Sequence, residues 1–134
     1  MKILHVFKQE NEFIAENYSA ALSRFEKAVE TYERSKWASL DYSSYALAKI
    51  LDLDNSRELP MLIEALCNLT PSLLTPKYYF VENGEVEEMT ELEVSESINK
   101  KYIINPLTGL EDFDFKKKVI RRFVLSEEVL ESEL

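Results

Sequence analysis

The residue types that most often perform catalysis or bind metals are scarce in this chain. His5 is the only histidine and Cys67 the only cysteine. A Ser-His-Asp or Cys-His arrangement would have to use His5, and nothing around it in the sequence supports such a pairing. His5 lies in a strand-like run at 5–7, whereas Cys67 follows Leu66 on an apolar helical face. We therefore expect a structural histidine, a buried structural thiol, no metal site and no cofactor.

Grouped carboxylates are the next candidates, because a pair can act as acid and base on a glycosidic bond or bind Mg²⁺. One pair is Asp52 with Asp54, and a second group is Glu111, Asp112 and Asp114. The first pair lies in an elbow where Asp commonly caps a helix, and DLDNS lacks the glycine and the twelfth-position Glu of a calcium loop. The second group alternates with phenylalanines, which places Asp112 and Asp114 on the outer face of a strand. Solvated carboxylates are the favoured interpretation.

The order of charges in the second half of the chain is more distinctive than these grouped carboxylates. Residues 82–96 contain seven carboxylates and no Lys or Arg: Glu82, Glu85, Glu87, Glu88, Glu91, Glu93 and Glu96. Residues 116–122 contain five cations: Lys116, Lys117, Lys118, Arg121 and Arg122. Two interpretations are open. Either the outward charges of neighbouring strands pair across the sheet, or the acidic segment forms an outward patch that binds a basic partner.

The composition is that of a folded, acidic protein. A hydrophobic content of 46% lies well away from the disordered class, and 134 residues fit a single domain. Sixteen basic and twenty-five acidic residues give a net charge of -9, which repels nucleic acid and anionic lipid. We expect a protein partner with a basic surface, and no direct nucleic-acid or membrane binding. The N-terminal segment becomes polar too soon for a signal peptide, so a cytoplasmic location is expected.

The first half has helical periodicity. A stripe at helical spacing predicts a helix over about 12–34: Ile14, Tyr18, Ala21, Leu22, Phe25, Val29 and Tyr32. A second helix is predicted to begin near Ser39 or Asp41 and to end before DLDNS. A third follows, capped by Asn55 or Ser56, with Pro60 in its first turn.

After Pro76 the periodicity changes to alternation. Asn83-Gly84 separates two strand-like runs in KYYFVENGEVEEMTELEV and predicts a type I′ hairpin. KYIIN is a predicted short strand, 106–109 a turn, and DFDFKKKVIRRFVL a long strand. The predicted fold is α+β: about three N-terminal helices packed on a C-terminal antiparallel sheet of about four strands. The single domain, 1–134, would have a mainly helical half at 1–70, a mainly β half at 77–126, and an acidic tail, frayed or a short amphipathic turn, at 127–134.

Two segments resemble helical repeats. Residues 44–66 resemble a HEAT-like repeat of the short bacterial type, through Ala46-Leu47-Ala48-Lys49-Ile50, Asp52 and Leu59-Pro60-Met61-Leu62-Ile63-Glu64-Ala65-Leu66. The elbow is longer, and Ala48 stands where Gly is common. Asn17-Tyr18-Ser19-Ala20-Ala21, with Phe25 and Ala28, is similar to the second helix of a tetratricopeptide repeat. Solenoids need about three repeats, so the resemblance implies one HEAT-like helix pair that covers a sheet and suits binding, with two ordinary core helices as the alternative.

These observations favour a binding protein over an enzyme. The most concrete hypothesis is an immunity protein or antitoxin that masks the basic active site of a toxin. Its predicted contact residues are Glu82, Glu85, Glu87, Glu88, Glu91, Glu93, Asp112 and Asp114. A secretion-type chaperone or adaptor that holds an effector segment is one alternative, and a carboxylate-based, metal-dependent enzyme is another.

Overall fold

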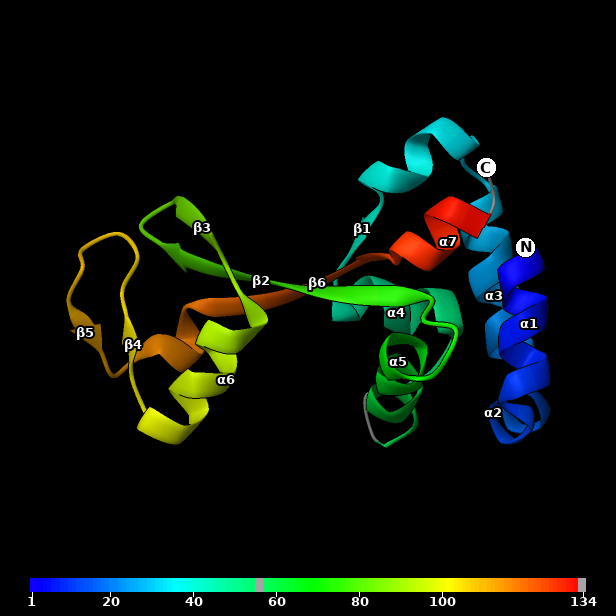
Figure 1. Cartoon of the computed structure of the whole chain (residues 1–134), viewed down its shortest axis with the longest axis horizontal. Coiled ribbons are helices and arrows are strands. Elements are labelled where there is room, and N and C mark those ends of the chain that lie inside the picture. The colour runs from blue at the N-terminus through cyan, green and yellow to red at the C-terminus, as the bar shows by residue number, and fades with distance from the viewer. Residues whose placement is uncertain (55–56, 133–134) are drawn as a thin grey trace. The chain divides into compact units, whose positions relative to one another are not determined.

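The computed structural model describes residues 1–54 and 57–132 and divides the chain into two compact units (Figure 1). Unit 1 consists of Met1–Thr75 and Phe123–Leu134, and unit 2 of Pro76–Arg122. Each unit has its own hydrophobic core. The first boundary, at Pro76, is the point where the sequence changes from helical to alternating periodicity. The prediction that residues 1–134 form one domain stays a prediction.

Three helices begin unit 1: α1 Lys2–Glu10, α2 Glu12–Asn17 and α3 Ser19–Glu30. The strand-like interpretation of 5–7 is wrong, because Ile3, Leu4 and Phe7 have helical spacing and are buried on one face of α1. The single helix predicted over 12–34 is divided at Tyr18, whose φ of -127° is not helical, and α3 ends at Glu30.

The segment after α3 contains the 3-10 helix η1, Arg34–Ser39, the two-residue strand β1, Asp41–Tyr42, and α4, Ser44–Leu51. The predicted start of this helix at Ser39 or Asp41 is wrong, because Ser43 is the N-cap and its Oγ accepts a hydrogen bond from the N–H of Ala46 at 3.0 Å. At the other end, Leu51 O accepts from Nε and Nη2 of Arg24, at 3.2 and 2.8 Å. A side chain of α3 therefore caps α4.

Helix α5, Glu58–Asn68, carries Pro60 in its first turn, as predicted. The predicted caps Asn55 and Ser56 lie outside the described residues. The acidic segment predicted to be frayed or a short amphipathic turn forms the short helix α7, Glu127–Ser132, over its described residues. Ser126 Oγ accepts from the N–H of Val129 at 3.1 Å, and the Val129 side chain is fully buried. An apolar residue and a cap thus hold the acidic segment as a helix.

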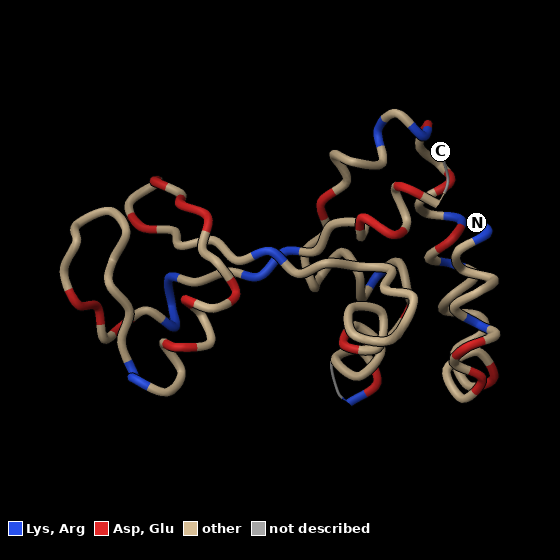
Figure 2. The backbone as a smooth tube through the Cα atoms, in the orientation of Figure 1, with Lys and Arg blue, Asp and Glu red and all other residues tan. Residues whose placement is uncertain are grey.

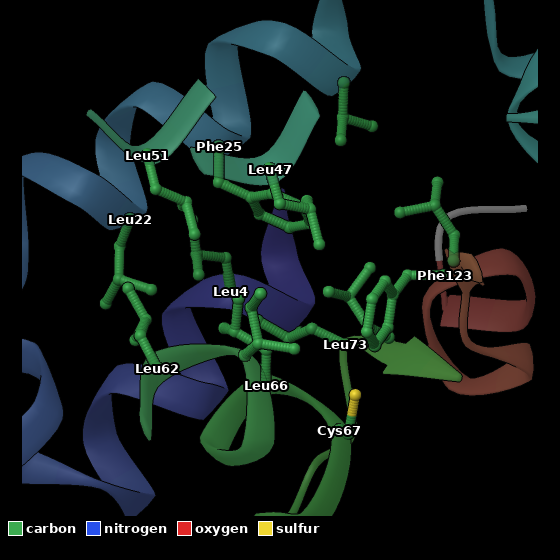
Figure 3. Close-up of a cluster of buried hydrophobic side chains, with 14 of the residues drawn as sticks. Leu4, Leu22, Phe25, Leu47, Leu51, Leu62, Leu66, Cys67, Leu73 and Phe123 are labelled. Atoms are coloured by element: carbon green, nitrogen blue, oxygen red, sulfur yellow. The ribbon is translucent and has the colours of Figure 1, made fainter. Parts of the chain in front are cut away.

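The core of unit 1 is formed by apolar side chains from its helices and from three strands (Figure 3). Leu4, Phe25, Leu47 and Leu66 are fully or almost fully buried in it. Cys67 is buried at its margin, as predicted for a structural thiol. The HEAT-like and tetratricopeptide-like resemblances stay predictions.

A four-stranded sheet has the order β1-β6-β2-β3, with β2 Leu74–Glu82, β3 Glu85–Met89 and β6 Val119–Leu125. An antiparallel four-stranded sheet is therefore confirmed. Its strands are not all C-terminal, contrary to the prediction, because β1 comes from the half predicted to be mainly helical. A separate two-stranded sheet pairs β4, Ile103–Ile104, with β5, Glu111–Asp112. The long strand predicted over 112–125 is wrong: it consists of the end of β5, the 3-10 helix η2, Phe115–Lys117, and β6.

Unit 2 is organised around the β2–β3 hairpin. Asn83 and Gly84 have φ values of 51° and 79°, which confirms the type I′ turn. The strand predicted to continue to Val94 is wrong, because α6, Glu91–Lys100, begins directly after Thr90. The Thr90 Oγ1 accepts from the N–H of Glu93, and the Glu93 carboxylate accepts from the N–H of Thr90, so this is a capping box. Val94 of α6 packs against the small core that contains Phe80.

Candidate functional site

The predicted contact residues lie in unit 2, most of them on the β2–β3 hairpin and the first turn of α6. Glu85 stands opposite Glu82, and Glu87 opposite Phe80. Since directly opposed residues share a face of the sheet, Glu85 and Glu87 are on the side of Phe80, towards the turn, where both are exposed. Val86 and Glu88 project from the opposite side.

Two predicted contact residues are held inside unit 2 by one lysine. The Lys118 ammonium donates to Asp112 Oδ2 at 2.7 Å and forms a second, short ion pair with Glu82. The hydrogen bond from Lys118 lowers the pKa of both carboxyl groups, and the same bonds raise the pKa of Lys118. The Asp112 side chain is only 9% exposed, so its interpretation as a solvated carboxylate is wrong.

Asn105 completes this polar cluster. Its Nδ2 donates to Glu82 at 3.3 Å and to Asp112 at 3.2 Å, while its Oδ1 accepts from the backbone N–H of Leu107 at 2.8 Å. The 4% exposed Asn105 therefore joins the hairpin to the turn between β4 and β5. We call Glu82, Asn105, Asp112 and Lys118 the lysine cluster. It stabilises unit 2 and presents little charge to a partner.

Other predicted contact residues form weaker local interactions. Glu88 lies 3.6 Å from the Lys77 ammonium, and both side chains are more than two fifths exposed. Asp114 lies 3.8 Å from Lys117 in an exposed pair. Glu93 belongs to the capping box described above. Exposed ion pairs of this kind contribute little to stability and exchange readily with solvent or another cation.

Three predicted contact residues have no cation within ion-pair distance in the described part of the chain: Glu85, Glu87 and Glu91. All are exposed. With Glu88 they form a series of carboxylates along β3 and into the first turn of α6, and no Lys or Arg lies between them in the sequence (Figure 2). We call Glu85, Glu87, Glu88 and Glu91 the acidic edge. Within the acidic segment 82–96, Glu82 is thus paired internally with Lys118, whereas Glu85, Glu87 and Glu91 are exposed and form no ion pair within the described chain.

An open groove lies beside the end of β3. It has a volume of about 440 Å³ and is lined by Lys77, Tyr78, Glu88 and Glu91 among others. Arg121 lies over the Tyr78 ring at 5.7 Å, so one of the five cations of residues 116–122 contacts this aromatic side chain. The groove therefore combines an aromatic surface with two carboxylates of the acidic edge.

The residues considered for catalysis do not form a site. His5 is on the exposed face of α1, with its Nε2 3.2 Å from Gln9 Nε2, whereas Cys67 is buried. Asp52 ends α4 in the left-handed conformation, with φ 54°. Within 1–54 and 57–132, no three side chains of His, Cys, Asp or Glu are placed to hold a metal ion together.

Comparisons with known proteins place this chain in no family. No family model, no curated protein and no solved structure matches it. Of the helices that the structure describes, none combines the length and apolar character needed to cross a membrane.

Sequence reasoning missed two positioning residues, although each has a local signature. Asn105 begins Asn-Pro-Leu-Thr-Gly, in which an Asn side chain commonly bonds to backbone N–H groups two or three residues ahead. Thr90 begins Thr-Glu-Leu-Glu, the pattern of a capping box. The capping box at Thr90 was missed because the alternating residues before it favoured continuation of the strand.

Proposed function

We propose that this chain acts by binding a protein with a basic surface through its acidic edge. In its most concrete form it is an immunity protein or antitoxin that neutralises a basic toxin by covering the toxin's active site. The observation that carries the proposal is that some of the carboxylates are ion-paired within the chain and others are not. Lys118 is bonded to Glu82 and Asp112, whereas Glu85, Glu87 and Glu91 are exposed and, within the described residues, without a bonded cation.

Charge complementarity gives this surface its physical role. Opposite potentials accelerate the encounter of two proteins and fix their relative orientation, and close charge pairs at an interface contribute to affinity. A nuclease cleft that binds phosphates is rich in Lys and Arg and presents the complementary charge. In this proposal the acidic edge contacts the toxin, and the lysine cluster holds the turn end of the hairpin through Glu82.

Charge reversal of the acidic edge tests the proposal. The tagged chain is used to isolate its partner from the native cell extract, the partner is identified, and association is then measured at several salt concentrations. The variant Glu85→Lys/Glu87→Lys is expected to slow association and to weaken its salt dependence. The control variant Glu10→Lys/Glu16→Lys makes the same charge change on exposed positions of α1 and α2. Equal association rates for the two variants would contradict the proposed contact surface.

A chaperone or adaptor function is the second candidate. It is supported by the position of β3 at the end of the strand order, since a terminal strand can hold an extended segment. The two functions differ in what binds. An antitoxin inhibits the activity of a folded toxin, whereas a chaperone binds an effector only in its unfolded or extended form.

A further inference from the structure

Strand β3 ends the order β1-β6-β2-β3, so one of its sides is paired with β2 and the other has no neighbouring strand among the residues that the structure describes. The backbone directions follow from one hydrogen bond: the N–H of Val81 donates to Lys118 O at 2.7 Å, away from β3. Backbone groups of successive strand residues point to alternate sides, so those of Phe80 and Glu82 point towards β3. Their opposed residues, Glu87 and Glu85, point back to β2.

The backbone N–H and C=O groups of Val86 and Glu88 consequently point away from β2. Both residues are exposed. The next N–H, that of Thr90, already donates to the Glu93 carboxylate at 3.2 Å. The unpaired edge therefore begins at Val86 and ends at Glu88, and this short length restricts the register of any strand that pairs with it.

The side chains along this edge favour a partner strand that carries positive charges. Glu85 and Glu87 project from one face, and Val86 and Glu88 from the other. A second copy of β3 would place carboxylates opposite carboxylates, which is unfavourable, so the edge resists pairing with itself. A strand with Lys or Arg at alternate positions would place its cations opposite Glu85 and Glu87.

We propose that the acidic edge binds its partner by strand addition: an extended segment of the partner pairs with β3 through the backbone groups of Val86 and Glu88, and its alternate basic side chains lie opposite Glu85 and Glu87. This inference rests on the proposed function, because it assumes the basic partner and adds that an extended segment of that partner makes the contact. It predicts an apolar or small partner side chain opposite Val86, which is 59% exposed.

Synthetic peptides test the backbone pairing directly. The probe is the acetylated and amidated hexapeptide Lys-Val-Lys-Val-Lys-Val. In the proposed register its valines stand opposite Val86 and Glu88 and supply the hydrogen bonds, while its lysines stand opposite the glutamates. N-methylation of the valines removes those donors, whereas N-methylation of the lysines leaves them and serves as the matched control. The valine-methylated peptide is expected to lose binding, and the lysine-methylated peptide to retain it.

Amide hydrogen exchange in the full chain shows where on β3 the peptide binds. When the peptide occupies about 90% of the molecules, exchange of the Val86 and Glu88 amides is expected to slow about tenfold. The reason is that these amides exchange only in the roughly 10% of molecules that have no peptide bound. The amides of Glu85 and Glu87, already directed to β2, are expected to change little. Equal slowing at all four amides, or at none, would overturn strand addition.

Two variants separate this inference from the proposed function. Val86→Pro removes an N–H that points away from β2, a position where an edge strand tolerates proline, and Val86→Thr keeps that N–H. Strand addition predicts that Val86→Pro weakens binding of the natural partner and Val86→Thr does not. If only Glu85→Lys/Glu87→Lys weakens binding, the acidic edge is the contact surface and strand addition is wrong. If neither Val86→Pro nor the charge reversal weakens it, both proposals are wrong.

Discussion

The ammonium of Lys118 lies 2.7 Å from Oδ2 of Asp112, and this ion pair joins the segment before β6 to the two-stranded sheet. The same ammonium bonds to Glu82 at the end of β2. One cation therefore neutralises two carboxylates that would otherwise repel each other. The consequence is structural, since removal of the lysine leaves two adjacent negative charges that are three quarters or more covered.

We expect Lys118→Met to destabilise unit 2 more than Lys116→Met. Lys116 is exposed and, among the described residues, forms no ion pair, so its replacement is a matched control. Hydrogen exchange of the amides in β2 and β3, measured as a function of denaturant, reports the opening of this unit. Equal protection in the two variants would show that the lysine cluster does not stabilise the hairpin.

The lysine cluster also makes stability depend on pH. The pKa values of Glu82 and Asp112 are lowered in the folded state by the hydrogen bonds from Lys118, so their contribution is complete above the ordinary carboxyl pKa of about 4. It is lost as pH falls through the lowered values. Lys118 has a raised pKa, and its contribution is lost only as pH rises through that value in strongly alkaline solution. Denaturant unfolding between pH 2 and 7 is expected to show a steeper loss of stability in the natural protein than in Lys118→Met.

The capping box of α6 should have a measurable effect. Thr90→Ala removes the side-chain acceptor for the Glu93 N–H and is expected to lower the free energy of unfolding by about 1 kcal/mol. Thr90→Ser keeps an acceptor at the same position and is expected to retain most of that stability. Thermal and denaturant unfolding of the two variants provide the comparison. A Thr90→Ser variant as unstable as Thr90→Ala would indicate that the methyl group, and not the cap, is responsible.

Asp52 is expected to be replaceable with a gain in stability. It adopts φ 54° and ψ 45° at the C-terminus of α4, a left-handed conformation that disfavours residues with a Cβ, and its charge opposes the helix dipole. Asp52→Gly is expected to raise the free energy of unfolding by about 0.5 to 1 kcal/mol, since the added flexibility of the unfolded chain offsets part of the gain. Asp52→Asn removes the charge alone and should give a smaller increase. A loss of stability in both variants would show that the Asp52 carboxylate has a structural role.

Local signals in the sequence account for the elements that were predicted correctly. Asn83-Gly84 specifies its turn because both residues accept positive φ, a property that does not depend on the rest of the molecule. Pro60 lies in the first turn of α5 for a similar reason, since its ring fits that position. Where two local patterns conflicted, the prediction failed. The alternating residues around Glu87 indicated a strand through Val94, but the capping box at Thr90 begins a helix instead.

By itself, the sequence determined that the chain is acidic, mixed in secondary structure and marked by an acidic hairpin, because charge and periodicity are properties of neighbouring residues. Only the tertiary structure decided which carboxylates are used internally. Lys118 reaches Glu82 and Asp112 because the strands and Asn105 bring distant segments together. Glu85 and Glu87, on β3 opposite Glu82 and Phe80, are exposed, and the described chain places no cation within ion-pair distance of them. Pairing of charges depends on distance in space, and that distance is set by the packing of Phe80 and its neighbours.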